Sequence, residues 1–452
     1  MKPNKVLVKI ICVVGMVLAA LLLYTAITGY LDDQTELQYA FNQTAQDPVP
    51  YPDAKFAIIS DLHYYDLSLG TSGQAFETCF NADRKLLLDS QDLLNLAINE
   101  IIAQKVDFVL IPGDLSKDGE LICHQTVANA LSRFKQHGIG VYVVPGNHDV
   151  DNQDAFQFEG INSIPVANIT AEQFADIYSE DGYGSAIYHD PDYLSYVAEP
   201  VNGLWIIAMD VCTYKSGEEE TRGGKISQSQ LDWLEEKLQE ANRSGKAVIF
   251  MEHHGVVEHW TGQSKLHPDY LVQDYPNLGK LLASYHVQVA FTGHYHAQDI
   301  AMARFEGSGR IYDVETGSLI TAPCPVRYCS FDENSLRITS TCLVGRLHQG
   351  TDFESKAYRL LRDAITREAD KTLIKYRVPE ADAQAVASNI AAGFVAHYEG
   401  DEDMSARPEF DGSNLGLWSR LVYSTQGYVV DGLWQDLPPA DNEVVLDLTE
   451  AS

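Results

Sequence analysis

Short apolar runs alternate with amphipathic segments through the first three quarters of the chain. The first three apolar runs predict strands, at residues 56–59, 108–111 and 141–144. Between them, Leu94, Ile98 and Ile101 share one face of a predicted helix, and residues 125–137 predict a second helix. Strand, helix and strand in this order form crossover units, so the pattern predicts a largely parallel sheet in an α/β fold.

The same alternation continues to about residue 342 and then gives way to a helical pattern. Later predicted strands lie at residues 204–209, 247–251, 287–291 and 311–314, with a helix at 230–240. Beyond residue 351, Tyr358, Leu361 and Ile365 share one helical face. We therefore expect an α/β domain over residues 54–349 and a helical C-terminal domain over residues 350–452.

The N-terminus carries an uncharged apolar stretch at residues 10–31, which follows three lysines. About 20 helical residues span a hydrocarbon core, and the lysines mark the cytoplasmic side. This predicts a signal anchor or transmembrane helix over residues 1–32, followed by a proline-rich tether over residues 33–53. A cleaved signal peptide and a buried core helix are the alternatives. With an anchor the remaining chain is extracytoplasmic and membrane-bound, and with a cleaved peptide it is secreted.

The charge balance excludes one class of partner. The chain holds 32 Lys plus Arg against 64 Asp plus Glu, which gives a formal net charge of −32. A chain this acidic repels polyanions, so we expect no nucleic-acid polymer as a partner. Its apolar content of 45% and charged content of 21% are ordinary for a globular protein. Much of the acidity lies at residues 380–450, in the predicted helical domain.

Six cysteines follow Cys12, which is few for a scaffold held together by disulfides. Cys324 and Cys329 are the best candidate pair, and two free thiols are the alternative. The chain has no Cys-x-x-Cys motif, so nothing supports a cysteine-type zinc site.

Residues that bind divalent metals follow five of the predicted strands. The five groups are Asp61-Leu62-His63, Gly113-Asp114, Gly146-Asn147-His148-Asp149, His253-His254 and Gly293-His294-Tyr295-His296. Ligands collect beyond the carboxyl ends of strands in α/β sheets, so we expect the five groups to converge. Two divalent ions need a carboxylate between them and neutral imidazoles around them. The pattern therefore predicts a dinuclear metal site.

These motifs, in this order, resemble the calcineurin-like metallophosphoesterase superfamily, with its D-x-H, G-D, G-N-H-D/E, H and G-H-x-H motifs. The resemblance implies a four-layer α+β arrangement, with two packed mixed β-sheets flanked by helices and a C-terminal helical appendage. It also implies the ligand sets: Asp61, His63 and His296 for one ion, Asn147, His253 and His294 for the other, with Asp114 as the bridge. His253 is preferred over His254 because the first histidine of the pair matches the family motif, although Gly255 replaces the usual proline.

The resemblance further implies a catalytic role for His148, which would stabilise the transition state or protonate the leaving oxygen while Asp149 orients it. A water or hydroxide held between the ions would attack phosphorus in line with the leaving alkoxide. His254, His259 and His124 are candidates for the wall of the substrate pocket, and satisfied loop histidines are the alternative for the first two.

A narrower resemblance concerns the substrate. Residues 76–90, 145–149 and 194–214, with the helical domain, are similar to secreted or anchored bacterial proteins described as cyclic nucleotide phosphodiesterases. We therefore expect hydrolysis of phosphodiester bonds in small nucleotides, cyclic ones included, with two ions of Mn, Fe or Zn, Mn being favoured. The alternatives are a phosphomonoesterase, nucleotidase or pyrophosphohydrolase at the same site, and a non-catalytic anchored binding protein.

Overall fold

The computed structural model describes residues 48–214, 222–332, 334–425 and 427–449. All of these residues belong to one compact unit, Gln43–Ser452. The predicted anchor over residues 1–32 and most of the predicted tether lie outside the described residues. In the ranges described, no helix combines the length and the apolar composition that a membrane span requires.

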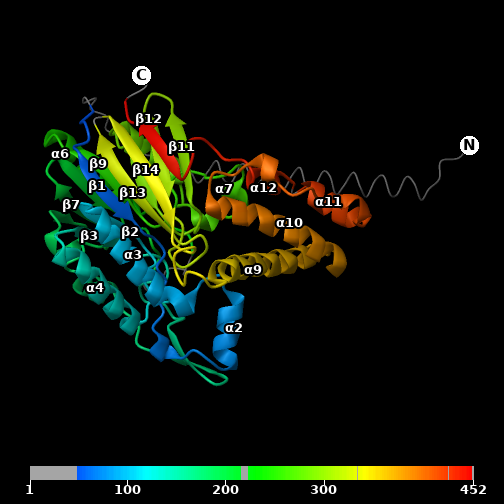
Figure 1. The fold of residues 1–452 in the computed structure, drawn as a ribbon. Coiled ribbons are helices and arrows are strands. Elements are labelled where there is room, and N and C mark those ends of the chain that lie inside the picture. Colours follow the sequence, from blue (N-terminus) through cyan, green and yellow to red (C-terminus); the bar gives the residue numbers. More distant parts are fainter. Residues whose placement is uncertain (1–47, 215–221, 333, 426, 450–452) are drawn as a thin grey trace, which may run out of the picture. The chain divides into compact units, whose positions relative to one another are not determined.

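The first sheet has six strands in the order β15-β14-β13-β1-β2-β3. Its strands are β1 (Ala54–Ile58), β2 (Phe108–Pro112), β3 (Gly140–Val144), β13 (Pro325–Asp332), β14 (Ser335–Cys342) and β15 (Glu443–Asp447). The first three run parallel to one another, and the last three add antiparallel neighbours. Helices α3 (Ser90–Gln104) and α4 (Leu121–Gln136) lie alongside β1, β2 and β3 (Figure 1).

The second sheet has seven strands in the order β11-β12-β10-β9-β8-β7-β6. Its strands are β6 (Tyr188–His189), β7 (Tyr196–Val201), β8 (Leu204–Ala208), β9 (Ala247–Met251), β10 (Val289–Thr292), β11 (Asp299–Phe305) and β12 (Gly309–Glu315). Strands β8, β9, β10 and β12 are parallel, and β6, β7 and β11 join antiparallel. Helices α6 (Gln228–Arg243) and α8 (Tyr275–Ser284) pack against this sheet.

The two sheets pack face to face. Phe56 on β1 stacks on Phe108 of β2 at 4.8 Å between ring centroids and meets the edge of Phe291 on β10 at 5.3 Å. This arrangement confirms the expected fold of two packed mixed sheets flanked by helices. The parallel strands predicted from the strand and helix alternation are present in both sheets, and antiparallel strands extend each sheet at its edges. Each sheet is buried by helices on one face and by the other sheet on the other. A continuous apolar strand fits either kind of burial.

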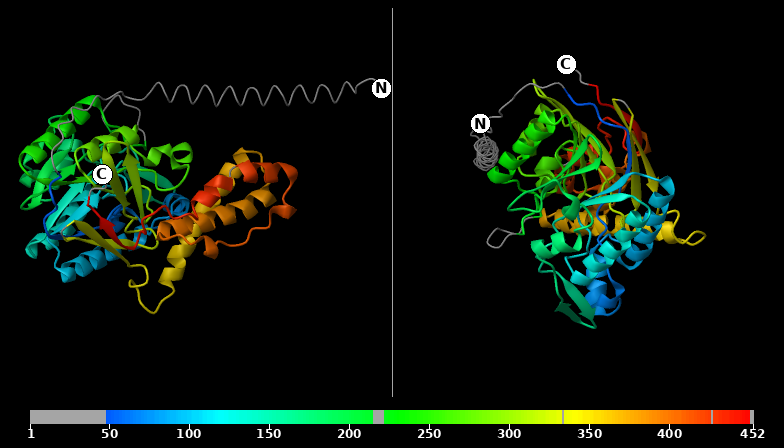
Figure 2. Two further views of the ribbon diagram at one scale, coloured as in Figure 1. Left: turned by 90° about the horizontal axis from the view of Figure 1, so that it is seen from above. Right: turned by 90° about the vertical axis from the view of Figure 1, so that its left-hand side faces the viewer.

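The C-terminal helices form a group beside the sheets (Figures 1 and 2). They are α9 (Phe353–Lys375), α10 (Glu380–Glu399), α11 (Leu417–Thr425) and α12 (Gly427–Gly432). After α12 the chain returns to the first sheet as β15, where Leu446 pairs with Leu336 of β14. The prediction of a wholly helical region over residues 350–452 is therefore wrong at its end. The helices are an insertion between two neighbouring strands.

The remaining elements are short. They are α2 (Gln74–Ala82), α5 (Ala171–Ile177), α7 (Gln263–Leu266) and the hairpin of β4 (Phe156–Glu159) and β5 (Asn162–Pro165). All six cysteines in the described ranges are free, Cys324 and Cys329 among them. The candidate disulfide between these two is therefore not formed, and the alternative of two free thiols holds.

Candidate metal centre

The loops that follow β1, β2, β9 and β10 bring metal-binding side chains together at the carboxyl ends of the strands, where the two sheets meet. Ligand atoms of the first group lie within 4.8 Å of one another; its members are Asp61, His63, Asp114 and His296. The second group meets the same criterion; its members are Asp114, His253 and His294. All six side chains are buried. The predicted convergence therefore occurs, but between two sheets rather than at the edge of one.

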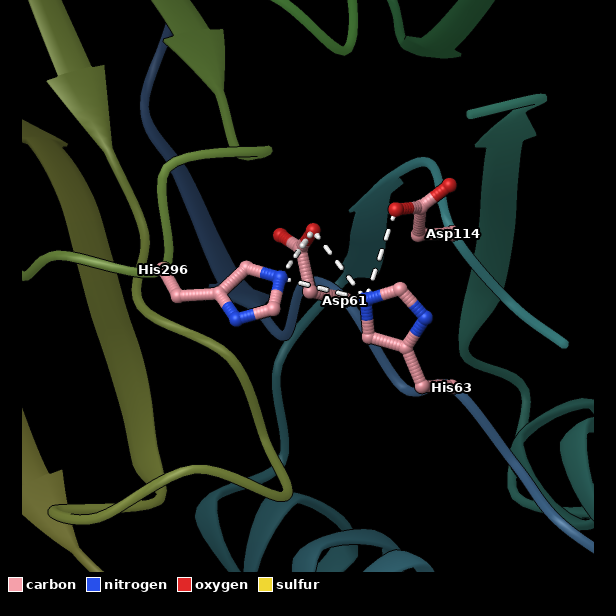
Figure 3. Close-up of side chains that lie close together, drawn as sticks. All are labelled: Asp61, His63, Asp114 and His296. Carbon is pink, nitrogen blue, oxygen red and sulfur yellow. Dashed lines mark hydrogen bonds and ion pairs between the residues drawn. The ribbon is translucent and has the colours of Figure 1, made fainter. Parts of the chain in front are cut away.

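The first group is built around three close contacts (Figure 3). His63 Nε2 lies 3.1 Å from His296 Nε2 and 3.3 Å from Asp114 Oδ2. His296 Nε2 in turn lies 3.3 Å from Asp61 Oδ1. Two carboxylates and two imidazoles thus point their ligand atoms at one small space.

The second group shares its carboxylate with the first. Asp114 Oδ2 lies 3.3 Å from His253 Nε2, the same distance that separates it from His63 Nε2. His253 Nε2 also lies 3.1 Å from His294 Nδ1 and 3.2 Å from Asn147 Oδ1. Asp114 therefore stands between the two groups, and Asn147 belongs beside the second.

The hydrogen bonds of His253 and His294 test whether these side chains fit a metal ion. His253 Nδ1 lies 2.8 Å from the carbonyl of Pro112, and His294 Nε2 lies 3.0 Å from the carbonyl of Asp269. A carbonyl only accepts, so each of these nitrogens carries the hydrogen. When both imidazoles are neutral, the other two nitrogens face each other across 3.1 Å with lone pairs. A cation between them removes this repulsion, and carbonyl-bound imidazoles of this kind are common metal ligands.

The protonation states agree with that fit. Burial lowers the pKa of His63, His294 and His296, so these imidazoles are neutral at neutral pH, the form that binds a metal. Burial also lowers the pKa of His253, but the carboxylate of Asp114 outweighs it and raises the value to about 9. In the absence of an ion, a proton on His253 offsets part of the negative charge of Asp114, which a bound metal would otherwise offset.

The backbone of these loops is strained. Five candidate ligands have positive φ angles, between 34° and 73°: Asp61, His63, Asp114, His294 and His296. Such angles are uncommon for residues other than glycine and concentrate at functional sites. Gly293 allows the approach of two loops, because a Cβ there would lie 2.5 Å from Asp61 Oδ2. The motif thus specifies tight turns as well as ligand types.

His148 lies beside the centre and is held by a carboxylate that sequence reasoning missed. Its Nδ1 donates to Asp118 Oδ1 at 2.7 Å, and its ring meets that of His63 at 4.9 Å between centroids. Although burial lowers the pKa of His148, the carboxylates of Asp114 and Asp118 raise it above the ordinary value. The signal for Asp118 was present in the sequence as an Asp-Gly turn four residues after Asp114.

The expectation that Asp149 orients His148 is wrong. The Asp149 carboxylate accepts hydrogen bonds from the backbone N–H groups of Leu115, Ser116 and Gly146, and from the Ser116 hydroxyl, at 2.9–3.1 Å. These four bonds use both carboxylate oxygens of Asp149. The carboxylate therefore joins the loops after β2 and β3. Asp149 therefore acts on the site through the backbone.

The three wall candidates have partners of their own. His254 Nε2 donates to the carbonyl of Arg222 at 2.8 Å, and His259 Nδ1 donates to Asp299 at 2.6 Å. His124 is fully buried between Tyr178 and the backbone of Asp149. The expectation that His124 lines the pocket is wrong. His254 and His259 are each hydrogen-bonded through one ring nitrogen only, since the other ring nitrogen is buried without a hydrogen-bond partner among the described residues.

Two residues that the sequence did not single out flank the centre. The Tyr270 ring is partly exposed and lies 4.9 Å from the His294 ring between centroids. Arg84 donates to the Tyr270 hydroxyl at 3.4 Å, and the Arg84 side chain is 21% exposed. They come from loops far apart in the chain, and no periodic pattern marks them.

Comparisons with known proteins bear on this site and fold. A family profile described as calcineurin-like phosphoesterase matches residues 54–298. A dimetal phosphatase structure from Danio rerio is 16% identical, with a TM-score of 0.46 and coverage of 66% of this chain and 97% of its own. A purple acid phosphatase from yellow lupin (Lupinus luteus) is 13% identical, with a TM-score of 0.36 and coverage of 66% and 53%. A search of curated proteins gave no match.

Proposed function

Since this chain belongs to the calcineurin-like phosphoesterase family, we propose that it is a phosphodiesterase that hydrolyses small nucleotides, cyclic ones included, with two divalent metal ions. The position of Asp114 carries this proposal. Its Oδ2 atom lies 3.3 Å from an imidazole nitrogen of each ligand group, His63 on one side and His253 on the other. A carboxylate shared in this way suits two adjacent cations.

The assignment of ligands follows the two groups. Asp61, His63 and His296 would hold one ion, Asn147, His253 and His294 the other, and Asp114 both. Two such ions, when bound, supply a water of lowered pKa and neutralise the phosphoryl oxygens. Mixed imidazole and carboxylate ligands suit Mn, Fe or Zn, and we favour Mn.

His148 would act on the leaving group. With Nδ1 held by Asp118, its Nε2 is free to carry the proton that the leaving alkoxide needs. The raised pKa of His148 keeps it protonated closer to neutral pH. Asp118 is a positioning residue in this scheme, since it touches the imidazole and not the reacting atoms.

Tyr270 and Arg84 support a nucleotide as the substrate. A partly exposed aromatic ring beside His294 offers a stacking surface for a base. The guanidinium next to its hydroxyl offers a positive charge for a second anionic group. The resemblance of residues 76–90, 145–149 and 194–214 to bacterial cyclic nucleotide phosphodiesterases favours the same substrate class.

The test compares a diester with a monoester. In Mn²⁺, the protein should hydrolyse bis-p-nitrophenyl phosphate and cyclic nucleotides faster than p-nitrophenyl phosphate. Asp114→Asn should lose turnover while keeping its circular dichroism spectrum. A faster rate on the monoester would favour the monoesterase alternative. No turnover of any ester in Mn²⁺, Fe²⁺ or Zn²⁺ would favour the non-catalytic binding protein.

We further propose that the chain is anchored in a membrane by residues 1–32 with its catalytic part outside the cytoplasm. The apolar stretch at residues 10–31 and the lysines before it support this. Protease added to intact cells should then digest the catalytic domain, and protection from protease would contradict the orientation. Release into the medium would instead favour the secreted alternative.

A further inference from the structure

A second set of metal-binding side chains lies where β11 meets the C-terminal helices. Asp299 begins β11, His397 lies in the last turn of α10, and Glu402 follows that helix. One ligand atom from each residue lies within 4.8 Å of the others. The three side chains are between 1% and 3% exposed. We call this set the β11–α10 cluster.

Two carboxylates of this cluster converge on one imidazole nitrogen. His397 Nδ1 lies 2.5 Å from Glu402 Oε1 and 3.4 Å from Asp299 Oδ2. Within the described residues, the other carboxylate oxygen of Glu402 is buried without a hydrogen-bond partner. A carboxyl oxygen buried without a hydrogen-bond partner carries a desolvation cost that nothing offsets. The free oxygen therefore indicates that a positive group belongs at this position.

The surroundings also carry an excess of negative charge. His259 contacts three carboxylates, those of Asp299 at 2.6 Å, Asp313 at 3.3 Å and Glu315 at 3.6 Å. The buried guanidinium of Arg327 donates to the backbone carbonyls of residues 299, 315 and 441 rather than to their carboxylates. Five buried carboxylates thus stand against three groups able to carry positive charge: Asp299, Asp313, Glu315, Glu402 and Asp441 against His259, His397 and Arg327.

Protonated carboxyl groups are the other way to relieve this excess. Burial and the neighbouring Asp299 raise the pKa of Asp441 to about 10, and burial raises the pKa of Glu315 well above its ordinary value, so without a cation both groups hold a proton at neutral pH. A protonated Asp441 still leaves the Glu402 oxygen without a partner, because Asp441 accepts from the backbone N–H groups of Ile300 and Asp401. Protons can therefore offset the charge excess, whereas a divalent ion would also supply the positive partner that the Glu402 oxygen lacks.

We propose that Asp299, His397 and Glu402 bind a third divalent metal ion, separate from the dinuclear centre. One imidazole and two carboxylates suit Zn²⁺ or Mn²⁺, whereas Ca²⁺ and Mg²⁺ prefer oxygen ligands alone. The proposal stands on residues that take no part in the proposed catalysis, so it does not depend on the substrate or on turnover.

Such an ion would hold the C-terminal helices against the catalytic loops. Asp299 lies three residues after His296, and the other two ligands belong to the helical insertion. The His397 ring lies 5.4 Å from the ring of Tyr295, which stands between the candidate ligands His294 and His296. The third ion would therefore join the helical insertion to the start of β11. The loop just before β11 carries two candidate ligands of the dinuclear centre, His294 and His296.

The test is a count of bound Zn²⁺ per chain by equilibrium dialysis and mass spectrometry of the metal. Glu402→Gln should bind one ion fewer than the wild type and should unfold at a lower temperature in Zn²⁺. Glu409→Gln changes an exposed acid of the same segment and should match the wild type in both measurements. His253→Ala, a change in the dinuclear centre, should retain the ion bound by the cluster.

Equal Zn²⁺ counts in the wild type and in folded Glu402→Gln would overturn the proposal. If Glu402→Gln does not fold, two other measurements decide. His397→Gln should bind one Zn²⁺ fewer than the wild type. A wild-type count of no more than two ions per chain would also overturn the proposal. Three ions in a protein that hydrolyses no phosphodiester would support the third site while contradicting the proposed function. The experiment can therefore contradict the third metal site without contradicting the proposed phosphodiesterase function, and the reverse.

Discussion

Nδ1 of His148 donates a hydrogen bond of 2.7 Å to Oδ1 of Asp118, which joins the loop after β3 to the loop after β2. The backbone N–H of His148 also donates to Asp114 Oδ1 at 2.9 Å. One loop thus holds both the main chain and the ring of His148. Because Asp114 is the shared metal-ligand candidate, the position of the imidazole is tied to the position of the centre.

Replacing Asp118 should slow the reaction without removing the metals. In Asp118→Ala the imidazole of His148 loses its acceptor and one of the two carboxylates that raise its pKa, so we expect a fall in kcat/KM of roughly 10²-fold for a phosphodiester with a poor leaving group. The fall should be small for a p-nitrophenolate leaving group, which needs no proton. A leaving-group series and the metal content measure the two effects. An equal fall across the series would contradict a role for His148 in protonation.

Adding a methyl group at Gly293 should damage the centre directly. A Cβ there would lie 2.5 Å from Asp61 Oδ2 and would also collide with the Ser60 hydroxyl. We expect Gly293→Ala to lower the free energy of unfolding by about 1–3 kcal/mol and to weaken metal binding, because the loop bearing Asp61 must move. Gly427→Ala is the control, since no atom lies within 4 Å of its Cβ position and its φ angle is not in the positive range that favours glycine. Unchanged metal affinity in Gly293→Ala would show that the loops adapt.

The C-terminal strand should contribute to the stability of the catalytic sheet. Leu446 in β15 is 2% exposed, whereas its neighbour Val445 is 48% exposed. Leu446→Ala should cost at least about 2 kcal/mol in the free energy of unfolding, because it leaves a cavity in the core. Val445→Ala should cost about 0.5 kcal/mol or less. Urea unfolding would measure both, and equal values would show that β15 does not share the core.

His124 should make the protein less stable in acid. Burial lowers its pKa to about 3, below the ordinary value of about 6.5 in the unfolded chain. The unfolded chain therefore binds the extra proton between these values. The stabilisation is complete above about pH 6.5 and is lost as the pH falls, by up to about 1.4 kcal/mol per pH unit.

His124→Gln should reduce this dependence. The variant loses the bonds to Tyr178 and Asp149 at pH 7, but its stability should fall less between pH 7 and pH 4. Chemical unfolding at several pH values gives the slope. The control is His137→Gln, an exposed histidine next to the end of the same helix, which should keep the wild-type slope. An unchanged slope in His124→Gln would contradict the neutral, buried state.

The sequence by itself located the parallel strands β1, β2, β3, β8, β9, β10 and β12, the helix face of Leu94, Ile98 and Ile101, and the loops that carry the candidate ligands. These features are local, because side-chain periodicity and the residues just beyond a strand lie within a few positions of one another. The motif order added the two-sheet arrangement through its family resemblance. The ligand candidates of the dinuclear centre were all visible as residues following predicted strands.

Tertiary structure alone decided the long-range partners. It selected Asp118 rather than Asp149 for His148, paired Leu446 with Leu336, and brought His397 against Asp299. Each choice depends on which loops and strands meet across many residues, and a periodic pattern carries no information about such pairing. The tertiary structure also placed the metal centre between two sheets. The strand pattern could not show this, because a buried strand has the same apolar pattern whether a helix or a second sheet covers it.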